Sequence, residues 1–494
     1  MTTTTKQRRS AAELLGDPVQ PTALDTIESA VLILGQSSGG DTSNGFEFYQ
    51  RCGGTTCYVP ELKIWLAFVD GVWSPTDPET LMQAFCADLV REAAEQYRDA
   101  KRGAIEDAKR ALSRAGQLFD DRRIQERALK QARPHMSISS ARFNRTPHLL
   151  GVANGVLNLK TLKLVMAPAS EYISKRMGCV YDPHADAPMW NRFICEVLPN
   201  ADERELLQRA IGAALFGVIL DRAIVFLLGE SGANGKSVLC NVLSRLFGDY
   251  HLTASADLLL QTKHDSDYKR ELTALSMGAR FVSINELPKH AVWDDKKIRD
   301  IASKDDLAAR RLYGESFSFT PTHHVFVRGN FAPGSQDSSD AFWGRIIPVP
   351  FDVQIPRARQ IGDLDEKIAA RELAGVLNWA LDGARAWRAD GEASGSLGKL
   401  ILPKVTIDTR ERYRAKTDYV ARWLGECTEE GDDFSEARPA LFASYRDFCH
   451  ASGLRNAGLD RELFDELEKR GFRRGARKGV RVLRGLRLRD ERFT

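Results

Sequence analysis

One nine-residue segment, Gly229-Glu-Ser-Gly-Ala-Asn-Gly-Lys-Ser237, constrains the fold more than any other part of the 494-residue chain. It follows the apolar run AIVFLLG, which is typical of a buried strand, and it leads into VLCNVLSRLFG, which has the apolar spacing of a helix. A strand, a glycine-rich loop and a helix in this order present backbone N–H groups and a helix N-terminus to a phosphate chain. The segment therefore predicts a P-loop nucleotide site. Its candidate ligand-binding residues are Gly232, Asn234, Gly235, Lys236 and Ser237.

The expected ligands of this loop are ATP and Mg²⁺, with the Lys236 ammonium on the β and γ phosphates and the Ser237 hydroxyl on the metal. The loop departs from the usual spacing G-x-x-x-x-G-K-[ST], because Gly229 stands one residue before the first glycine of that pattern. We expect Gly232 to compensate. The alternative is a glycine-rich turn that contains Gly-Lys-Ser by chance, and the readable strand and helix on either side disfavour it.

Two further apolar segments, ARFVSINE and HHVFVRGN, each end in polar residues, as parallel strands do when their carboxyl ends face a ligand. The order of segments predicts an α/β fold with a parallel central sheet. Glu286 ends the first segment and is the candidate for polarising the attacking water and for the magnesium shell. Asn330 ends the second segment and is the candidate for orienting the water or the γ phosphate. The alternative for both residues is a surface position at the end of a strand.

The order of these motifs resembles superfamily 3 DNA helicases, and more narrowly the C-terminal part of phage and plasmid primase-helicases, including the poxvirus-type branch. The resemblance covers roughly residues 145–355. The matching segments are residues 153–159, 181–183, 188–190, 234–237, 285–288, 302–313, 317–321, 329–333 and 342–351. Asn285 departs from the paired acids often found beside Glu286, so one carboxylate would serve both roles or act through water.

The resemblance implies an AAA+ core that works in a homo-oligomeric ring, expected to be a hexamer, on single-stranded and forked DNA. In this core Glu286 would activate water, Asn330 would sense the γ phosphate, and Arg345 would act as an arginine finger on the ATP of a neighbouring subunit. Gly344 stands where the family often has a second arginine. The family's DNA-contacting channel hairpin corresponds to residues 304–313, and its candidates are Lys304, Arg310, Arg311 and Tyr313. A surface arginine and a solvated loop are the alternatives.

Composition shifts divide the chain into five parts. A flexible tail and linker (1–40) ends in the stretch SSGGDTSNG, which we expect to be irregular. An N-terminal α+β and helical region (41–145) contains short strands around an Asp70-Gly71 turn, then one or two long helices over residues 79–132. The remaining parts are a collar-like domain (146–215), the AAA+ core (216–388), and, after a Gly/Ser-rich linker, a basic winged-helix-like domain (400–494).

The last part of the chain carries the clearest charge asymmetry. The whole chain has 70 Lys and Arg against 67 Asp and Glu, a net charge of +3, which is too small to indicate nucleic acid. Basic residues gather between Arg470 and Arg492, however, and within that stretch only Asp490 and Glu491 oppose them. We expect a β-hairpin over GVRVLRGLRLR that contacts DNA, including origin duplex DNA. The alternative is a strand with a solvated face.

Composition excludes several classes of protein. No run of about 18 uncharged apolar residues is present, and the N-terminus lacks the apolar core of a secretory signal, so we expect no membrane contact and an intracellular location. The resemblance to phage and plasmid proteins implies that this location is the cytoplasm of a bacterial host. The eight cysteines are scattered, and no second pair follows Cys52 and Cys57 at zinc-ligand spacing. Residues 1–145 also offer no Asp-x-Asp, so we expect no primase active site.

The function expected from the sequence is that of an ATP-dependent replicative DNA helicase of a phage, plasmid or mobile element. Its 3′ to 5′ polarity comes only from the resemblance. One alternative is an origin-binding initiator whose ATPase melts or remodels DNA without processive unwinding. Another is a non-enzymatic assembly factor that binds nucleotide structurally.

Overall fold

The computed structural model describes residues 40–262, 266–289, 291–310, 316–335, 339–452, 458–477 and 479–489. The chain divides into two compact units, Met1–Arg142 and Phe143–Thr494. Each unit has a hydrophobic core of its own. Within the described ranges, no helix combines the length and the apolar character that a membrane span needs.

The first unit combines a small antiparallel sheet of strand order β1-β2-β3 with helices. Apart from a 3-10 turn, its described elements are α2 (Asp41–Cys52), β1 (Thr56–Val59), β2 (Ile64–Val69), β3 (Val72–Thr76), α3 (Pro78–Asp99), α4 (Ile105–Asp120) and α5 (Arg122–Met136). The predicted hairpin turn is confirmed, because Asp70 and Gly71 join β2 to β3 with φ of 53° and 79°. Two consecutive positive φ angles are the signature of the type I′ turn.

Two expectations for this unit were wrong. Residues 1–39 of the expected tail and linker lie outside the described residues, but residues 41–45 of the stretch expected to be irregular form the first turns of α2. Tertiary packing explains the difference: Asn44 is buried and accepts a hydrogen bond from Arg114, and a Cβ at Gly45 would lie 2.6 Å from the Ala128 carbonyl. Residues 79–132 form three helices rather than one or two, because Asp121 caps a new helix by accepting from the backbone of the next turn.

The second unit begins with a three-stranded antiparallel meander and two helices. These are β4 (Leu149–Val152), β5 (Gly155–Asn158), β6 (Lys163–Val165), α6 (Pro188–Val197) and α7 (Ala201–Phe216). β4, β5 and β6 pair in sequence order, and the two helices follow them within the range expected for the collar-like domain.

A five-stranded, wholly parallel sheet forms the centre of the second unit, as the α/β prediction requires. Its strand order is β13 (Ile346–Pro350), β7 (Ile224–Leu228), β12 (His324–Gly329), β9 (Phe281–Ile284), β8 (His251–Ala254). Alternate residues of β7 point to opposite faces: Val225 and Leu227 join one core cluster, and Ile224 and Phe226 join the other. Both faces are therefore covered, which is typical of parallel sheets.

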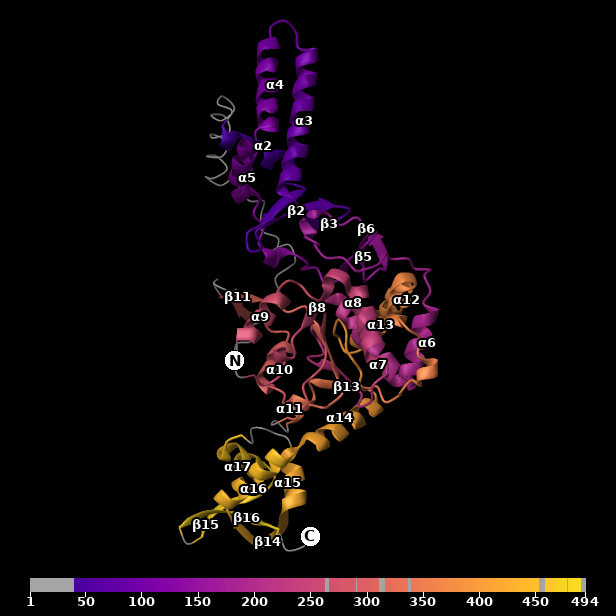
Figure 1. Ribbon diagram of the computed structural model, residues 1–494, viewed down its shortest axis with the longest axis vertical. Helices are drawn as coiled ribbons and strands as arrows, with labels where there is room; N and C mark the ends of the chain where they lie inside the picture. Colours follow the sequence, from indigo (N-terminus) through magenta and orange to yellow (C-terminus); the bar gives the residue numbers. More distant parts are fainter. Residues whose placement is uncertain are drawn as a thin grey trace, which may run out of the picture. The chain divides into compact units, whose positions relative to one another are not determined.

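Helices flank this sheet on both sides (Figure 1). The cluster around Val225 contains α7, α8 (Lys236–Phe247) and α13 (Leu373–Glu392), with α12 (Leu364–Arg371) at its border. The cluster around Phe226 contains α9 (Ser266–Leu275), α10 (Asp295–Ile301) and α11 (Asp340–Trp343). A separate antiparallel hairpin, β10 (Leu307–Arg310) with β11 (Ser316–Phe319), leaves the sheet after α10.

The segment expected to link the core to the C-terminal domain is packed. Residues 389–392 complete α13, and a Cβ at Gly398 would lie 2.3 Å from the Trp387 ring. The next helix, α14 (Lys404–Thr417), falls inside the range 400–494 predicted as the basic domain. Its Tyr413 is nevertheless buried in the core beneath the sheet.

The C-terminal elements are α15 (Tyr419–Cys427), β14 (Thr428–Ala437), α16 (Arg438–Ala451), α17 (Asp460–Lys469), β15 (Arg473–Arg477) and β16 (Val480–Leu488). Three helices, α15, α16 and α17, thus precede the last two strands. The predicted hairpin over GVRVLRGLRLR was wrong in its bounds, because VRVLRGLRL is one strand that pairs with β15 on one side and with β14 on the other. The sequence of β14, TEEGDDFSEA, has few residues that favour strands and was not anticipated.

Candidate functional site

The crevice between β7 and β12 has the topology of a ligand site. The helix that follows β7, α8, packs on one face of the sheet, whereas α11, which follows β12, packs on the other. In open α/β sheets, ligands bind outside the carboxyl ends of strands at such a reversal. The two strand ends meet directly, since the Gly229 N–H donates to the Gly329 carbonyl at 3.2 Å.

The loop between β7 and α8 is held in shape by close backbone approaches. A Cβ at Gly229 would lie 2.5 Å from both Asn234 Nδ2 and the Phe351 carbonyl, so only glycine fits there. Gly235 caps α8 with φ of 85°, and its Cβ would meet Val197 at 2.5 Å. A Cβ at Gly232 would meet nothing within 4 Å. Gly229, which stands one residue before the usual place of the first glycine in the motif, is thus sterically required. Gly232 is under no such steric constraint, so the expectation that it compensates for the shifted glycine has no steric basis.

Asn234 and Lys236 turn inward in this loop. The Asn234 amide is buried and donates to the Ser231 carbonyl at 2.6 Å. The Lys236 ammonium, on a residue that is 6% exposed, donates to the Gly229 carbonyl at 2.7 Å. Burial lowers the pKa of Lys236 to about 8, and the positive charge of Arg328 adds to this effect. A desolvated ammonium at a helix N-terminus is a group that an anion would stabilise, so the donor set fits a phosphate chain.

Polar residues from the neighbouring strands lie at the same edge of the sheet. Ser237 is exposed in the first turn of α8, Glu286 is exposed two residues beyond β9, and Asn330 is exposed directly after β12. Glu286 has φ of 63° and Ala233, in the loop, has φ of 56°. Left-handed conformations cost energy in residues other than glycine and gather at functional sites. The structure therefore brings the predicted P-loop, Glu286 and Asn330 to one edge.

Arg345 lies at the opposite edge. It directly precedes β13, and its carbonyl accepts from the Ile224 N–H at the beginning of β7 at 2.8 Å. The five residues of β13 separate it from the carboxyl edge, which at about 3.3 Å per residue is roughly 16 Å. Its guanidinium is half-buried and donates to the Ala341 carbonyl. Arg345 is therefore remote from the P-loop of its own chain.

Sequence analysis missed the contribution of α14. A cavity of about 280 Å³ beside the P-loop is walled by Glu230 and Asp352 on one side and by Thr409, Arg412 and Lys416 of α14 on the other. Lys416 Nζ lies 3.3 Å from Glu230 Oε1. No local signal marks these residues, because α14 stands far along the chain from the P-loop and its sequence reads as an ordinary charged helix.

The described part of the predicted DNA-contacting segment is solvent-facing. Lys304 is exposed before β10 and Arg310 is exposed as its last residue, whereas Leu307 and Ala309 of the same strand are buried. The backbone of the hairpin is anchored by Thr273, which donates to the Arg310 carbonyl at 3.1 Å. Arg311 and Tyr313 lie outside the described residues.

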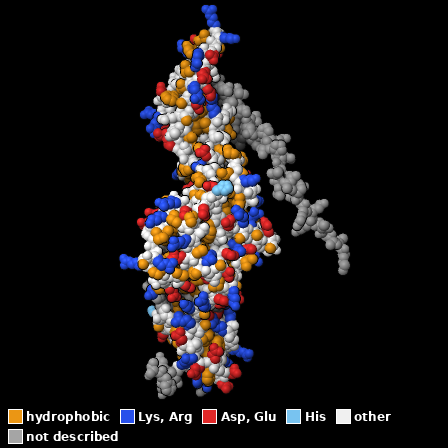
Figure 2. Space-filling view, turned by 90° about the vertical axis from the view of Figure 1, so that its right-hand side faces the viewer, with side chains coloured by type: hydrophobic (Ala, Val, Ile, Leu, Met, Phe, Trp, Pro, Cys, Tyr) orange, Lys and Arg blue, Asp and Glu red, His pale blue; other side chains and the backbone are white. Residues whose placement is uncertain are grey.

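The basic C-terminal segment is partly neutralised by acids that are distant in sequence. Arg487 pairs with Glu429 of β14 at 2.7 Å, Arg470 pairs with Asp418 at 2.8 Å, and Arg474 pairs with Glu468 at 2.9 Å. On the face drawn in Figure 2, Lys and Arg side chains are interspersed with Asp and Glu side chains. The expectation that only Asp490 and Glu491 oppose this segment was wrong, because it counted only neighbours in sequence. The exposed arginines of the β15–β16 hairpin for which no acidic contact appears in the described structure are Arg473, Arg477, Arg481 and Arg484.

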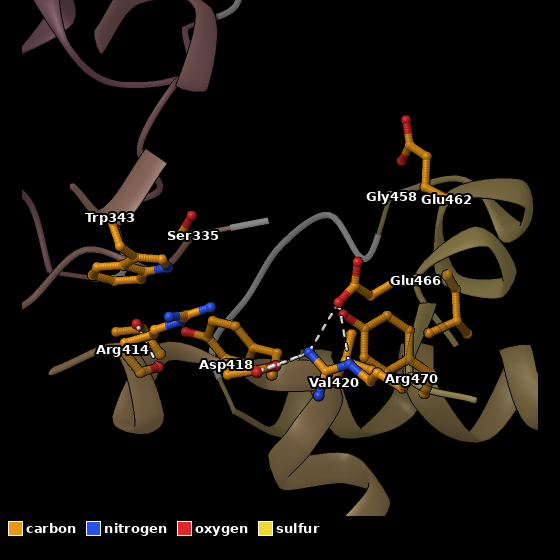
Figure 3. A pocket seen from close by; sticks show the side chains of 13 residues that line it. Ser335, Trp343, Arg414, Asp418, Val420, Gly458, Glu462, Glu466 and Arg470 are labelled. Atoms are coloured by element: carbon orange, nitrogen blue, oxygen red, sulfur yellow. Dashed lines mark hydrogen bonds and ion pairs between the residues drawn. The ribbon is translucent and has the colours of Figure 1, made fainter. Parts of the chain in front are cut away.

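A second cavity lies where α14 meets the C-terminal helices. Trp343 and Arg414 line it from one side and Glu466 and Arg470 from the other (Figure 3). Arg470 bonds both Asp418 and Glu466 there, at 2.8 and 3.1 Å. This cavity is walled by groups that already pair with one another, and it lies away from the P-loop residues.

No built metal site is evident in the described ranges. Among those residues, no three His, Cys, Asp or Glu side chains come together as metal ligands. The eight cysteines are free thiols. A magnesium ion would therefore depend on Ser237, Glu286 and the phosphates themselves, which is the usual mode of binding for this ion in nucleotide sites.

Comparisons with known proteins agree with a viral replication context. Residues 47–199 match the family described as D5 N terminal like. The chain is 24% identical over 310 residues to "Putative helicase 121R" of Invertebrate iridescent virus 3, covering 58% of this chain and 33% of that protein. It is 21% identical over 367 residues to "Putative primase C962R" of African swine fever virus (strain Badajoz 1971 Vero-adapted), covering 70% of this chain and 38% of that protein.

A further relative is "Putative helicase V13" of Sputnik virophage, 26% identical over 226 residues, with 43% of this chain and 28% of that protein covered. The matched part spans about a third of the length of these relatives. Among solved structures, the C-terminal region of NrS-1 (residues 305–718) matches with a TM-score of 0.44 at 8% identity, covering 87% of this chain and 96% of that one. The chain thus carries a D5 N terminal like region and is homologous to viral proteins whose names describe them as helicases and primases.

Proposed function

We propose that the protein is an ATP-hydrolysing replicative DNA helicase of the superfamily 3, AAA+ type, in the poxvirus-type branch. The observation that carries this proposal is the meeting of the P-loop, Glu286 and Asn330 at one edge of a parallel sheet, with Arg345 at the opposite edge. The relatives named as helicases support the choice of DNA as the substrate on which ATP is spent.

Within one chain the residues would divide the work as follows. Lys236 binds the outer phosphates, and the α8 N-terminus binds the inner ones. Glu286 accepts the proton of the attacking water, and Asn330 orients the water or the terminal phosphate by its amide. Mg²⁺, bound through Ser237 and the phosphates with Glu286 beside it, would neutralise charge that develops on the phosphoryl oxygens.

The position of Arg345 supports a shared site. A guanidinium roughly 16 Å from its own P-loop edge cannot reach its own ATP without a rearrangement of the sheet. It can serve the ATP of a neighbouring copy, where it would stabilise the charge of the transition state. We propose a ring of identical subunits, six by family resemblance, that moves along single-stranded DNA in the 3′ to 5′ direction with Lys304 and Arg310 at the strand.

The second candidate function is an origin-binding initiator. The β15–β16 hairpin supports it, because Arg473 and Arg484 lie directly opposite each other and like charges so placed are costly without an anion between them. Helices α15–α17 followed by this hairpin also suit a winged helix, which we propose for the C-terminal elements.

ATP turnover with and without single-stranded DNA, followed by strand displacement on a forked duplex, tests the proposal. We expect DNA-stimulated turnover and displacement, both abolished in Lys236→Ala. Glu286→Gln should keep nucleotide binding and lose turnover, because an amide cannot act as a base. The control is Lys404→Ala, an exposed lysine in the first turn of α14. Turnover with duplex binding but no displacement would favour the initiator, and no turnover at all would leave only a nucleotide-binding assembly factor.

A further inference from the structure

The cavity between the P-loop and α14 has an unusual wall for a nucleotide site. One side is the beginning of the P-loop, including Glu230, and the other is a helix that stands almost two hundred residues later in the chain. Its volume of about 280 Å³ far exceeds the 10–15 Å³ or so that one water needs. The cavity can therefore admit a group as large as a phosphate.

The position of α14 is fixed by one buried side chain. The Tyr413 ring lies 5.7 Å from that of Phe226 in β7 and 5.0 Å from that of Trp343. Its hydroxyl donates to the Pro333 carbonyl at 2.9 Å and accepts from Trp293 Nε1 at 2.7 Å. Residues three or four apart share a helix face, so Thr409 and Lys416 lie on the face of Tyr413, and Arg412 lies beside them, three residues from Thr409 and four from Lys416. The cavity wall is therefore rigidly attached to the sheet.

The charges in this wall have weak partners. Lys416 is paired with Glu230 at 3.3 Å, but both side chains are largely exposed, at 71% and 76%. Arg412 faces a carboxylate pair: burial raises the pKa of Glu203, the charge of Asp352 raises it further, and the charge of Arg412 lowers it. The exposed pair of Lys416 and Glu230 contributes little and exchanges readily. A multiply charged phosphate would compete successfully for both cations.

The terminal phosphate is the one that this cavity suits. The inner phosphates belong at the N-terminus of α8, which begins at Lys236. The cavity instead adjoins the first residues of the loop and Ala332, two residues beyond Asn330. Asn330 is the residue proposed to orient the terminal phosphate, so the cavity lies on that phosphate's side of the loop.

We propose that Arg412 and Lys416 of α14 bind the terminal phosphate of ATP in the same chain as the P-loop, so that α14 distinguishes ATP from ADP. The inference rests on the proposed function, because it assigns two further ligands to the same nucleotide. Each nucleotide site would then have the cations of α14 from its own chain and Arg345 from a neighbouring subunit. Glu230 acts as the competing partner that holds Lys416 when the terminal phosphate is gone.

Calorimetric titration of the full chain with a non-hydrolysable ATP analogue and with ADP tests this proposal. The double variant Arg412→Ala/Lys416→Ala should bind the ATP analogue at least about tenfold more weakly, which is the lower range for charge-assisted contacts, and should bind ADP within about twofold of the unchanged chain. The control is Lys404→Ala, on the same helix but outside the cavity wall, and it should change neither affinity. Equal losses for both nucleotides, or no loss for either, would overturn the proposal.

A second variant predicts a change of opposite sign. Glu230→Gln removes the competitor of Lys416 and should tighten binding of the ATP analogue by about two- to fivefold, the range expected from an exposed ion pair. The gain should vanish in a Lys416→Ala background. A gain that persists there, or its absence in the single variant, would contradict the exchange of partners. Failure of the proposed function looks different: turnover or strand displacement would then be absent, while the difference between the ATP analogue and ADP in these binding titrations would be unaffected.

Discussion

The pH dependence of nucleotide binding follows from the burial of Lys236. Its pKa of about 8 in the ligand-free chain lies far below the ordinary value of 10.5, mainly because burial disfavours the ammonium. Phosphates beside the ammonium would raise that pKa again. Binding must therefore take up a proton wherever the pH lies between the two pKa values, and affinity falls as the pH rises through about 8.

The magnitude can be worked from that value. With a pKa of about 8, roughly three quarters of the Lys236 side chains carry the proton at about pH 7.5 and roughly 3% carry it at about pH 9.5. If bound nucleotide returns the pKa to 10 or above, the affinity for ADP should be about 20-fold weaker at the higher pH. ADP is the suitable ligand because its phosphates keep a constant charge over this interval.

Calorimetry in buffers of different ionisation enthalpy measures both the affinity and the protons taken up. Lys236→Arg is the matched control, because a guanidinium stays protonated throughout and should give a flat profile, whatever its absolute affinity. Lys416→Ala should keep the slope of the unchanged chain. An affinity for ADP that does not vary over this interval, with no proton uptake, would refute the assignment of Lys236 as the buried phosphate ligand.

Three further outcomes are expected. Arg345→Ala should bind nucleotide normally and turn it over about 10³-fold more slowly or worse, and mixing it with Lys236→Ala subunits should restore some activity; verified mixed rings without rescue would count against a shared site. Tyr413→Phe should lower the free energy of unfolding by about 1–3 kcal/mol in denaturant titration, because it leaves the buried Trp293 N–H without its acceptor; an unchanged midpoint would contradict that bond. Deleting residues 418–494 should weaken duplex binding and flatten its salt dependence while basal turnover persists. Deleting residues 400–494 should in addition remove Tyr413 from the core and lower the free energy of unfolding by about 3–5 kcal/mol, so equal stability of the two truncated chains would contradict this role of Tyr413.

The strand–loop–helix unit around residues 229–237 and the parallel sheet could be predicted because their signals are local. A strand, a loop and a helix within residues 224–247 carry their own apolar periodicity, and the polar residues that end β9 and β12 follow from strand direction. The steric role of Gly229 could not be predicted, since it depends on the Phe351 carbonyl contributed by the far end of β13. The motif's departure from usual spacing is thus explained by a contact distant in sequence.

Elements that depend on tertiary partners escaped prediction. The composition of the first residues of α2 is typical of a linker, and these residues are helical because Gly45 packs against the backbone of α5. The acidic strand β14 has little strand propensity, and it is extended because β16 offers a free edge and Arg487 offers Glu429 a partner. The same pairing removed part of the apparent basic patch. Counting charges along the sequence overestimated the positive charge of this surface, because the acidic residues of β14 stand about fifty residues before the β16 arginines beside which they lie.

The helix α14 joins the cavity beside the P-loop to the C-terminal elements. Lys416 reaches the P-loop cavity, and two residues later Asp418 binds Arg470 of the C-terminal elements through side chains that are only 19% and 21% exposed. Salt screens partly buried ion pairs far less than exposed ones, so a displacement of α14 would change the interaction of Asp418 with Arg470 at the end of α17. If the terminal phosphate displaces Glu230 from Lys416 and this change reaches α17, the coupling is reciprocal: DNA bound to the β15–β16 hairpin would alter ATP affinity by the same factor by which ATP alters DNA affinity. The Glu230–Lys416 contact is the one through which nucleotide would act on α14.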